Sequence, residues 1–277
     1  MPSQSQKATI LMCPPDYFTV DYVINPWMRP GTVDRDLARR QWETLKTAIE
    51  TQAGAQVEVL SPVEGLPDLV FTANAAFVHE RKAILARYRH PERQGETPYC
   101  EAWFQANGYE TFHVAEGVSF EGAGDALKWL APGAEKPLVF AGYRTRTDII
   151  SHNDISRITG LSVLSMELAT DAFYHIDVCI CPMENGVFLY YPEAFDSYGL
   201  TVIEENVHES LRVPITLEEA QHFSGNAVNI GDTVIYNQGS PRITEALRAK
   251  GLNVIELDLS EFLKSGGSAK CLTLRIA

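Results

Sequence analysis

The sequence predicts an α/β protein built from repeated units of strand, turn, strand, helix and strand. Three observations carry this prediction. Short apolar or alternating runs are interspersed with amphipathic stretches, the same order of elements recurs at intervals of roughly 50 residues, and no proline- or serine-rich linker divides the chain. Such a period is typical of a propeller-like or repeat architecture rather than of one doubly wound sheet. We therefore expect one domain, residues 1–277.

Strands are predicted wherever apolar or alternating runs are bounded by turn-forming residues. In the first half of the chain they cover residues 8–13, 56–60, 69–78, 83–87 and 109–114. Asn74 interrupts the run 69–78. Burying an amide without partners costs about 1–3 kcal/mol, so Asn74 must either be satisfied internally or face a ligand.

The second half repeats the pattern. Strands are predicted at residues 137–142, 161–168, 174–183, 187–191, 253–257 and 272–276, with a further strand hairpin over 226–236. Asn185-Gly186 is a strong hairpin signal between the strands 174–183 and 187–191.

Helices are predicted from apolar residues at helical spacing and from their capping residues. They cover residues 34–53, 97–106, a stretch ending at 159, a short segment from 216, and 241–250. Gly54 closes the first of them, Thr147 or Asp148 is expected to cap the third, and Pro241 begins the last.

Composition excludes several classes of protein. The chain is 45% hydrophobic and 21% charged, which suits a globular core. Its net charge of −13 argues against nucleic acid; it would favour approach of a cationic small molecule, but solubility alone explains an acidic surface, so the charge only removes partners. No apolar run approaches the roughly 18 residues of a membrane helix, and residues 1–7 are not followed by a signal-type segment. The five cysteines are not spaced as in a zinc site or a disulfide framework. We therefore expect a cytoplasmic protein with reduced thiols and no bound metal.

Cys271 is the candidate nucleophile. It stands between the Gly266-Gly267 pair, which permits close approach of the backbone to a ligand, and the alternating run 272–276. The alternative is an inert buried thiol, because free cysteine behaves as a small hydrophobe.

Two acidic segments are candidates for the rest of the chemistry. On a strand, His175 and Asp177 share one face and resemble an acid/base pair, although a core histidine with a hydrogen-bond partner is the alternative. The turn Glu121-Gly-Ala-Gly-Asp125 places two carboxylates at a pocket or at the surface, and it lacks the spacing of a dinucleotide loop.

Three further polar residues are candidates for ligand contacts. Asn25 precedes Pro26, which restricts it to an extended conformation. Its side chain is expected either to contact a ligand or to form a turn. Arg144 and Arg146 precede a predicted helix and form either a carboxylate- or phosphate-binding corner or a solvated loop.

Taken together, these pieces resemble the guanidino-group-modifying enzymes, the family of arginine deiminase, dimethylargininase, amidinotransferases and arginine dihydrolase. The resemblance spans nearly the whole chain and rests on motifs in the family's order: Phe71-Thr72-Ala73-Asn74, Glu121-Gly122-Ala123-Gly124-Asp125, Gly142 with Arg146-Thr147, His175-Ile176-Asp177, Asn226 with Asn229-Ile230-Gly231-Asp232, and Gly266-Gly267 before Cys271. It implies a five-bladed α/β propeller (the pentein fold) of β-β-α-β units and no cofactor.

The resemblance also implies roles for the candidate residues. Cys271 matches the nucleophile and His175 the general acid/base, while Glu121 and Asp177 match carboxylates that hold the guanidinium. Arg146 matches the arginine that takes the substrate α-carboxylate.

The remaining matches are looser. Arg144 falls in a more variable position, Asp125 closes the acidic glycine turn as a further substrate contact, and Asn25 is similar to an asparagine of the dihydrolase branch.

Asn74 stands where deiminases and dimethylargininases usually carry aspartate, and dihydrolases carry asparagine. An amide both donates and accepts hydrogen bonds, so it can hold neutral citrulline as well as cationic arginine. The leading hypothesis is therefore hydrolysis of L-arginine through citrulline to ornithine, carbon dioxide and two ammonia.

Three alternatives stay open. They are a deiminase or dimethylargininase that stops at citrulline, a non-catalytic arginine-binding protein, and an amidino transfer to an amine. The expected partner is a small molecule, L-arginine or citrulline, and not nucleic acid or membrane; a homo-oligomer is compatible with the sequence.

Overall fold

The last strand of the chain pairs with the first, and this pairing closes a ring of sheets. In the computed structural model, which describes residues 7–277, β15 (Leu274–Arg275) lies antiparallel to β1 (Thr9–Met12), with Ile10 opposite Arg275. The prediction that residues 1–7 do not begin a signal peptide concerns residues 1–6, which lie outside the described residues.

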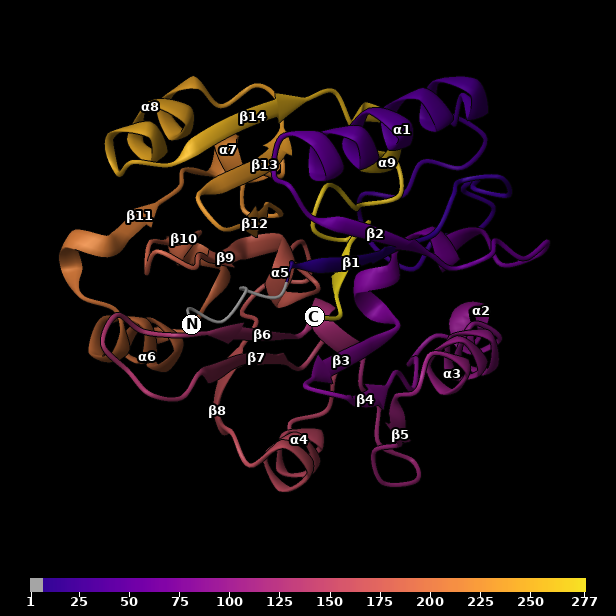
Figure 1. Cartoon of the computed structure of the whole chain (residues 1–277), viewed down its shortest axis with the longest axis horizontal. Helices are drawn as coiled ribbons and strands as arrows, with labels where there is room; N and C mark the ends of the chain where they lie inside the picture. The colour runs from indigo at the N-terminus through magenta and orange to yellow at the C-terminus, as the bar shows by residue number, and fades with distance from the viewer. Residues whose placement is uncertain (1–6) are drawn as a thin grey trace, which may run out of the picture.

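Five three-stranded sheets form the ring within residues 7–277 (Figure 1). In each sheet the middle strand lies antiparallel to the inner strand and parallel to the outer strand. Besides the closing blade β15-β1-β2, the blades are β3-β4-β5, β6-β7-β8, β9-β10-β11 and β12-β13-β14. The fold is thus the five-bladed α/β propeller of β-β-α-β units that the resemblance implied.

The strands lie close to the predicted ranges except for β3 and β9, which are shorter than predicted, and β11, which was not predicted. Their bounds are β2 (Gln56–Val59), β3 (Ala76–His79), β4 (Lys82–Leu85), β5 (Glu110–Phe112), β6 (Ala126–Trp129), β7 (Leu138–Tyr143), β8 (Ser162–Glu167), β9 (Ile180–Pro182), β10 (Phe188–Tyr190), β11 (Arg212–Pro214), β12 (Val228–Ile230), β13 (Thr233–Asn237) and β14 (Asn253–Leu257).

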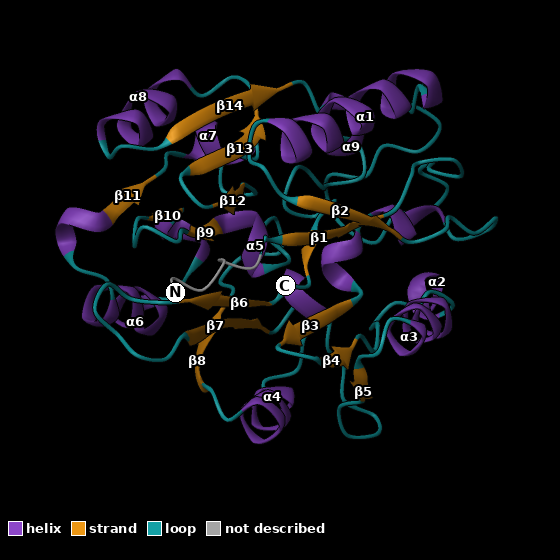
Figure 2. Ribbon diagram, in the orientation of Figure 1, coloured by secondary structure: helices purple, strands orange, loops and turns teal. Residues whose placement is uncertain are grey.

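A helix connects the middle strand to the outer strand of each blade, because parallel neighbours require a crossover. These helices lie at the rim of the ring (Figure 2). The crossover helices are α1 (Arg35–Thr51), α2 (Pro91–Gln94), α3 (Thr97–Ala106), α4 (Ser151–Thr159), α6 (Ser197–Asn206) and α8 (Pro241–Ala249). Three further helices lie between blades or before an inner strand: α5 (Ile176–Cys179), α7 (Leu217–Gln221) and α9 (Ser260–Leu263). None of these helices, within the described part of the chain, could span a bilayer.

Helix α1 illustrates how the sequence forms these elements. The Asp34 side chain accepts a hydrogen bond from Leu37 N and caps the helix, and Trp42, Leu45 and Ile49 form its buried face. Gly54 follows with a φ of 69°, a conformation in which glycine is not strained.

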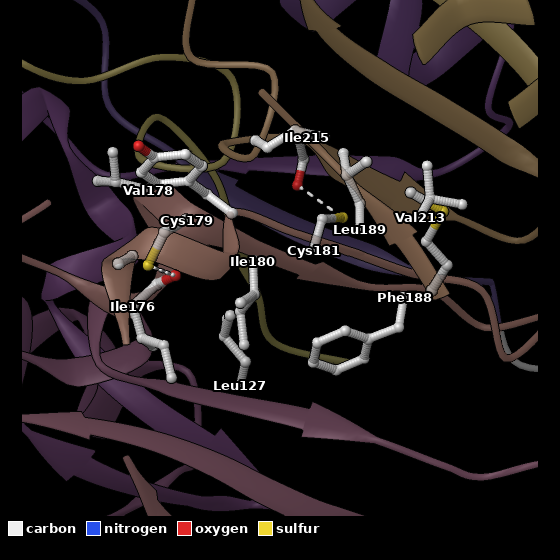
Figure 3. Packing of buried hydrophobic residues seen from close by; sticks show 14 of the residues in the cluster. Leu127, Ile176, Val178, Cys179, Ile180, Cys181, Phe188, Leu189, Val213 and Ile215 are labelled. Atoms are coloured by element: carbon white, nitrogen blue, oxygen red, sulfur yellow. Dashed lines mark hydrogen bonds between the residues drawn. The ribbon is translucent and has the colours of Figure 1, made fainter. Parts of the chain in front are cut away.

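The prediction of one strand over residues 174–183 is wrong. Residues 176–179 form the helical turn α5, and the strand begins at Ile180. Figure 3 shows this turn packed in the core, where the Cys179 thiol donates to Ile176 O at 3.3 Å. His175, Asp177, Cys179 and Cys181 therefore do not share one strand face.

Two other boundaries differ from the predictions. The short 3-10 helices Pro67–Val70 and Thr72–Asn74 occupy the first part of the predicted run 69–78, and β3 begins only at Ala76. Helix α4 begins at Ser151, and its N-cap is Ile150, without a side-chain hydrogen bond, rather than Thr147 or Asp148.

Candidate active site

One short segment precedes the inner strand of each blade, and four of these five segments carry candidate residues. Asn74 precedes β3, Glu121 precedes β6, His175 and Asp177 precede β9, and Cys271 precedes β15. Because the five inner strands surround one axis, the segments at their starts are brought together at one end of it (Figure 1). The propeller thus gathers residues that are up to about 200 positions apart in sequence.

The Cys271 thiol is 3% exposed and has two polar neighbours. Asn226 Nδ2 lies 3.0 Å from the sulfur and donates to it, and Asp177 Oδ2 lies 3.6 Å away. Burial, reinforced by the negative charge of Asp177, raises the pKa of Cys271 well above its usual range. Without a ligand the thiol is therefore protonated at neutral pH.

His175 is held by Glu121. Its Nε2 lies 2.7 Å from Glu121 Oε2, which also accepts from Arg146 Nη1 at 2.9 Å. Burial alone would raise the pKa of Glu121, but Arg146 and His175 outweigh burial and hold the pKa well below its usual range. Glu121 is thus an anion that orients the imidazole, and it leaves His175 Nδ1 without a hydrogen bond among residues 7–277.

The two aspartates near the histidine are both fully buried but occupy different places. Asp177 faces the Cys271 sulfur, whereas Asp125 Oδ1 accepts from Ile176 N at 3.0 Å and fixes the start of α5. Burial raises the pKa of Asp177 to about 7 and that of Asp125 to about 6. The structure thus brings Asp177 to the thiol and places Asp125 behind the histidine.

The raised pKa of Asp177 predicts a pH-dependent stability. Between about pH 4 and pH 7 the native state keeps a proton on Asp177 that the unfolded chain has lost, so this carboxyl group lowers the free energy of unfolding as the pH rises. Above about pH 7 the native group ionises too, and its contribution becomes constant.

Asp177→Asn is expected to remove this dependence. Urea unfolding of both proteins from pH 4.5 to pH 8 measures it: the free energy of unfolding of the variant should increase relative to wild type by about 3 kcal/mol across this range. A difference that stays constant with pH would show that Asp177 ionises normally.

Asn74 is fixed in one orientation by a residue that the sequence did not indicate. Arg93 Nη1 donates to Asn74 Oδ1 at 2.8 Å, and Arg93 is itself held by both oxygens of Glu96, at 2.8 and 2.9 Å. Within residues 7–277, Asn74 Nδ2 makes only a long contact, 3.4 Å, to Glu121 O. The amide therefore has its acceptor occupied and its donor group largely available.

Close packing explains why Gly122 and Gly124 of the acidic turn are glycines. A Cβ on Gly124 would overlap Asn74 Nδ2 and lie 3.3 Å from His175 Nδ1, and a Cβ on Gly122 would lie 2.7 Å from Asn74 O. These glycines let Asn74 and His175, which come from the blades on either side, approach the acidic turn closely.

The two predicted arginines lie in different surroundings. Arg146 is 1% exposed, pairs with Glu121, donates to Ile24 O at 2.9 Å and lies over the Tyr174 ring. Arg144 is largely exposed and contacts Leu168 O at 2.6 Å and Asp171. The structure therefore brings Arg146, and not Arg144, to the candidate site.

Asn25, in the loop between β1 and α1, contacts the segment that precedes Cys271. Its Nδ2 donates to Ser265 O at 3.0 Å and its Oδ1 accepts from Trp27 N at 2.9 Å. A Cβ on Gly266, whose φ is 86°, would lie 2.8 Å from Asn25 Oδ1. The asparagine thus makes the predicted turn and also ties down the glycine pair before Cys271.

A small cavity joins these groups. Asn25, Asn74, Arg93, Arg146 and Cys271 line it, and its volume of about 10 Å³ holds about one water molecule. Entry of an amino acid therefore requires side chains or loops to move. A larger cavity of about 500 Å³ lies among the inner strands and is lined by none of the nine candidate residues.

Several residues of the site were missed as candidates. Asp68, Arg93 and Tyr174 line the small cavity, and Asn226 contacts the thiol. Arg93 follows His90-Pro91-Glu92 and resembles a solvated turn in sequence, so only its burial against Glu96 reveals it. Asn226 lies just before an inner strand, as the other site residues do. This shared position in the repeat could have indicated Asn226 from the sequence.

The described residues were also searched for side chains that could bind a metal ion. Among residues 7–277 no group of three or more His, Cys, Asp or Glu side chains is arranged to hold a metal ion. All five cysteines are unpaired thiols.

Comparison with known proteins places this geometry in a family. The family model for N,N dimethylarginine dimethylhydrolase (eukaryotic) matches residues 17–277. The bifunctional arginine dihydrolase/ornithine cyclodeaminase AgrE of Nostoc sp. is 43% identical over 98% of this chain. The match covers 38% of AgrE, so the chain spans well under half the length of that relative.

Two solved structures agree over the whole fold. The N-terminal domain of ArgZ bound to product, an arginine dihydrolase from the ornithine-ammonia cycle in cyanobacteria, is 43% identical with a TM-score of 0.94, and the match covers 98% of both chains. A variant of the same domain, covalently bonded to a reaction intermediate, is 42% identical with a TM-score of 0.93 and the same coverage.

Proposed function

This chain belongs to the N,N-dimethylarginine dimethylhydrolase family, and from that premise we propose that it hydrolyses L-arginine through a covalent intermediate on Cys271. The reaction runs through bound citrulline to ornithine, carbon dioxide and two ammonia. The orientation of Asn74 is the observation that supports ornithine, rather than citrulline, as the final product. The Asn74 oxygen accepts from Arg93, whereas its Nδ2 is largely available to a ligand.

That orientation suits a neutral second substrate. Arginine presents only N–H donors from its guanidinium, whereas the ureido group of citrulline presents a carbonyl oxygen as well. A carboxylate at position 74 would repel this oxygen. Asn74 Nδ2 donates to it, which supports retention of citrulline for a second round.

When arginine binds, its guanidinium replaces that of Arg146 as the partner of Glu121. In the ligand-free site the guanidinium of Arg146 pairs with Glu121 Oε2, close to His175. The guanidinium of arginine takes this place between Glu121 and Asp177, and Arg146 is released to bind the substrate α-carboxylate with two parallel hydrogen bonds.

The first round forms and hydrolyses a bond to sulfur. The Cys271 sulfur, after losing its proton, attacks the guanidinium carbon, and protonated His175 gives a proton to the departing ammonia. Neutral His175 then takes a proton from water, which attacks the S-alkylthiouronium carbon and displaces the thiolate. The product is citrulline.

The second round repeats these steps on the ureido carbon. Thiolate attack and loss of ammonia leave an S-carbamoyl intermediate, and water displaces the sulfur to give the carbamate of ornithine. The carbamate decomposes to ornithine and carbon dioxide. Each round consumes one water and releases one ammonia, so the overall reaction balances.

Parallel incubations with arginine, citrulline and N,N-dimethylarginine test the proposal. Ornithine should form from arginine and from citrulline supplied alone, and urea should not form. Citrulline as the end product would leave an arginine deiminase. Release of dimethylamine from dimethylarginine, faster than ammonia from arginine, would favour the activity for which the family model is named.

The setting of this reaction is part of the proposal. Residues 1–277 act as one catalytic domain, because the pairing of β15 with β1 closes the ring through both ends of the chain. A reduced nucleophile requires a reducing compartment, which favours the cytoplasm. The partners are the small molecules arginine and citrulline, and a homo-oligomer is compatible with the fold.

A further inference from the structure

Asn226 occupies, in the fourth complete blade, the position that carries a site residue in every other blade. It lies in the turn before the inner strand β12, as Asn74 does before β3, Glu121 before β6 and Cys271 before β15. Its side chain is fully buried. The proposed reaction has so far given this residue no role.

The Asn226 amide uses its full hydrogen-bonding capacity on the groups around the thiol. Its Oδ1 accepts from Ser268 N and from Cys271 N, both at 3.1 Å. Its Nδ2 donates to Asp177 O at 2.9 Å and to the Cys271 sulfur at 3.0 Å. The two backbone N–H donors fix which end is the oxygen, so the NH₂ group must face the sulfur.

We propose that Asn226 is a catalytic residue that stabilises the thiolate of Cys271 and aims it at the substrate carbon. This inference rests on the proposed function, since it concerns the same nucleophile. A hydrogen bond from an amide N–H to a thiolate is charge-assisted and roughly twice as strong as one to a neutral thiol. Asn226 therefore favours the reactive form selectively.

Formation of the thiolate needs a proton acceptor, and one is in place. The S–H bond breaks, the sulfur keeps the electron pair, and the proton moves to Asp177 Oδ2, 3.6 Å away. This transfer also removes the negative charge that faces the sulfur. The hydrogen bond from Asn226 is retained throughout, so the sulfur does not turn away when it loses its proton.

Other charged groups also act on the sulfur. Asp177 from α5 disfavours the thiolate, while Lys270 from the cysteine's own loop favours it. Tyr174, on the segment before α5, is a further titratable group in the same surroundings. Asn226 differs from these groups because it donates a hydrogen bond to the sulfur, at 3.0 Å, and carries no charge that varies with pH.

Alkylation of Cys271 by iodoacetamide in the absence of arginine tests the inference. Wild type and Asn226→Ala are compared from pH 6 to pH 10 by mass analysis of the peptide that contains Cys271. Loss of a hydrogen bond to a charged group should shift the profile to higher pH by about one to two units, which is a 10- to 100-fold slower reaction at fixed pH. The neutral alanine adds no charge of its own.

Asn237→Ala is the matched control. Asn237 is another buried amide whose hydrogen bonds go to His222 O, Gln238 O and Leu259 N, none of them part of the site. This variant loses a comparable set of bonds, and its alkylation profile should match that of wild type.

A purely structural role would give a different result. A folded Asn226→Ala protein whose alkylation profile matches wild type would overturn the inference. If Asn226→Ala does not fold, Asn226→Ser, which keeps a short hydroxyl for the loop N–H groups, is measured in the same way and is judged by the same shift.

Steady-state kinetics separate this inference from the proposed function. If arginine is hydrolysed, kcat of the variant should fall 10- to 100-fold with KM unchanged within about threefold, because Asn226 contacts the sulfur and not the cavity. If arginine is not a substrate, the alkylation profile still decides the role of Asn226.

Discussion

Replacement of Cys271 by serine should lower the rate of arginine hydrolysis at least about 10³-fold. A serine hydroxyl at this place is a far weaker nucleophile than a thiolate, and Asp177 and Asn226 are arranged around sulfur. Binding of arginine should persist, because Cys271 makes none of the contacts that hold the guanidinium. Steady-state rates and thermal stabilisation by arginine measure the two effects separately.

Cys100→Ser is the control for this substitution. Cys100 is an equally buried thiol on α3, outside the small cavity, and its variant should keep a rate near that of wild type. Turnover of Cys271→Ser within tenfold of wild type, or a covalent adduct trapped on another residue, would contradict the assignment of the nucleophile.

Asn74→Asp should stop the reaction at citrulline. The new carboxylate can still accept from Arg93, so the variant should fold and bind cationic arginine. It loses the donor that faces the ureido oxygen, and loss of such a bond to a buried group should slow the second round by roughly 10²-fold. Amino-acid analysis of the products over time measures the ratio of citrulline to ornithine.

The same substitution away from the site provides the comparison. Asn253→Asp lies at the exposed start of β14 and should leave the product ratio unchanged. Ornithine forming as rapidly in Asn74→Asp as in wild type would show that the amide donor does not determine the end point.

The repeat pattern of the fold was accessible from the sequence because each blade is a local unit. Helix α3 begins and ends at the predicted residues, and the strand hairpin over 226–236 appears as β12 and β13. Helix α6 was missed. It contains Gly199 and three β-branched residues in ten, which weaken the helical pattern, although the Asp196 cap was a usable signal.

The error at residues 174–183 has a tertiary cause. Alternation of polar and apolar residues predicts a strand, but Asp125 Oδ1 takes the backbone N–H of Ile176 and holds residues 176–179 as a helical turn. The contact crosses 51 positions of sequence, so no local pattern reveals it.

The candidate site was predictable only in part, for a related reason. Motifs before inner strands indicated Asn74, Glu121, His175, Asp177 and Cys271, which the structure brings together. Arg93 contacts Asn74 across 19 positions of its own blade, and Asn226 contacts Cys271 across 45 positions. Arg144, two positions before Arg146, contacts Leu168 and Asp171 instead. The roles of all these residues stay predictions.

The amount of ammonia released per arginine consumed tests the account most directly. Purified protein is incubated with a limiting amount of L-arginine until none remains, and ammonia, citrulline and ornithine are then quantified. The arrangement of Asn74, Arg93 and Cys271 predicts about two ammonia and one ornithine per arginine, with little citrulline. One ammonia and one citrulline per arginine would contradict it.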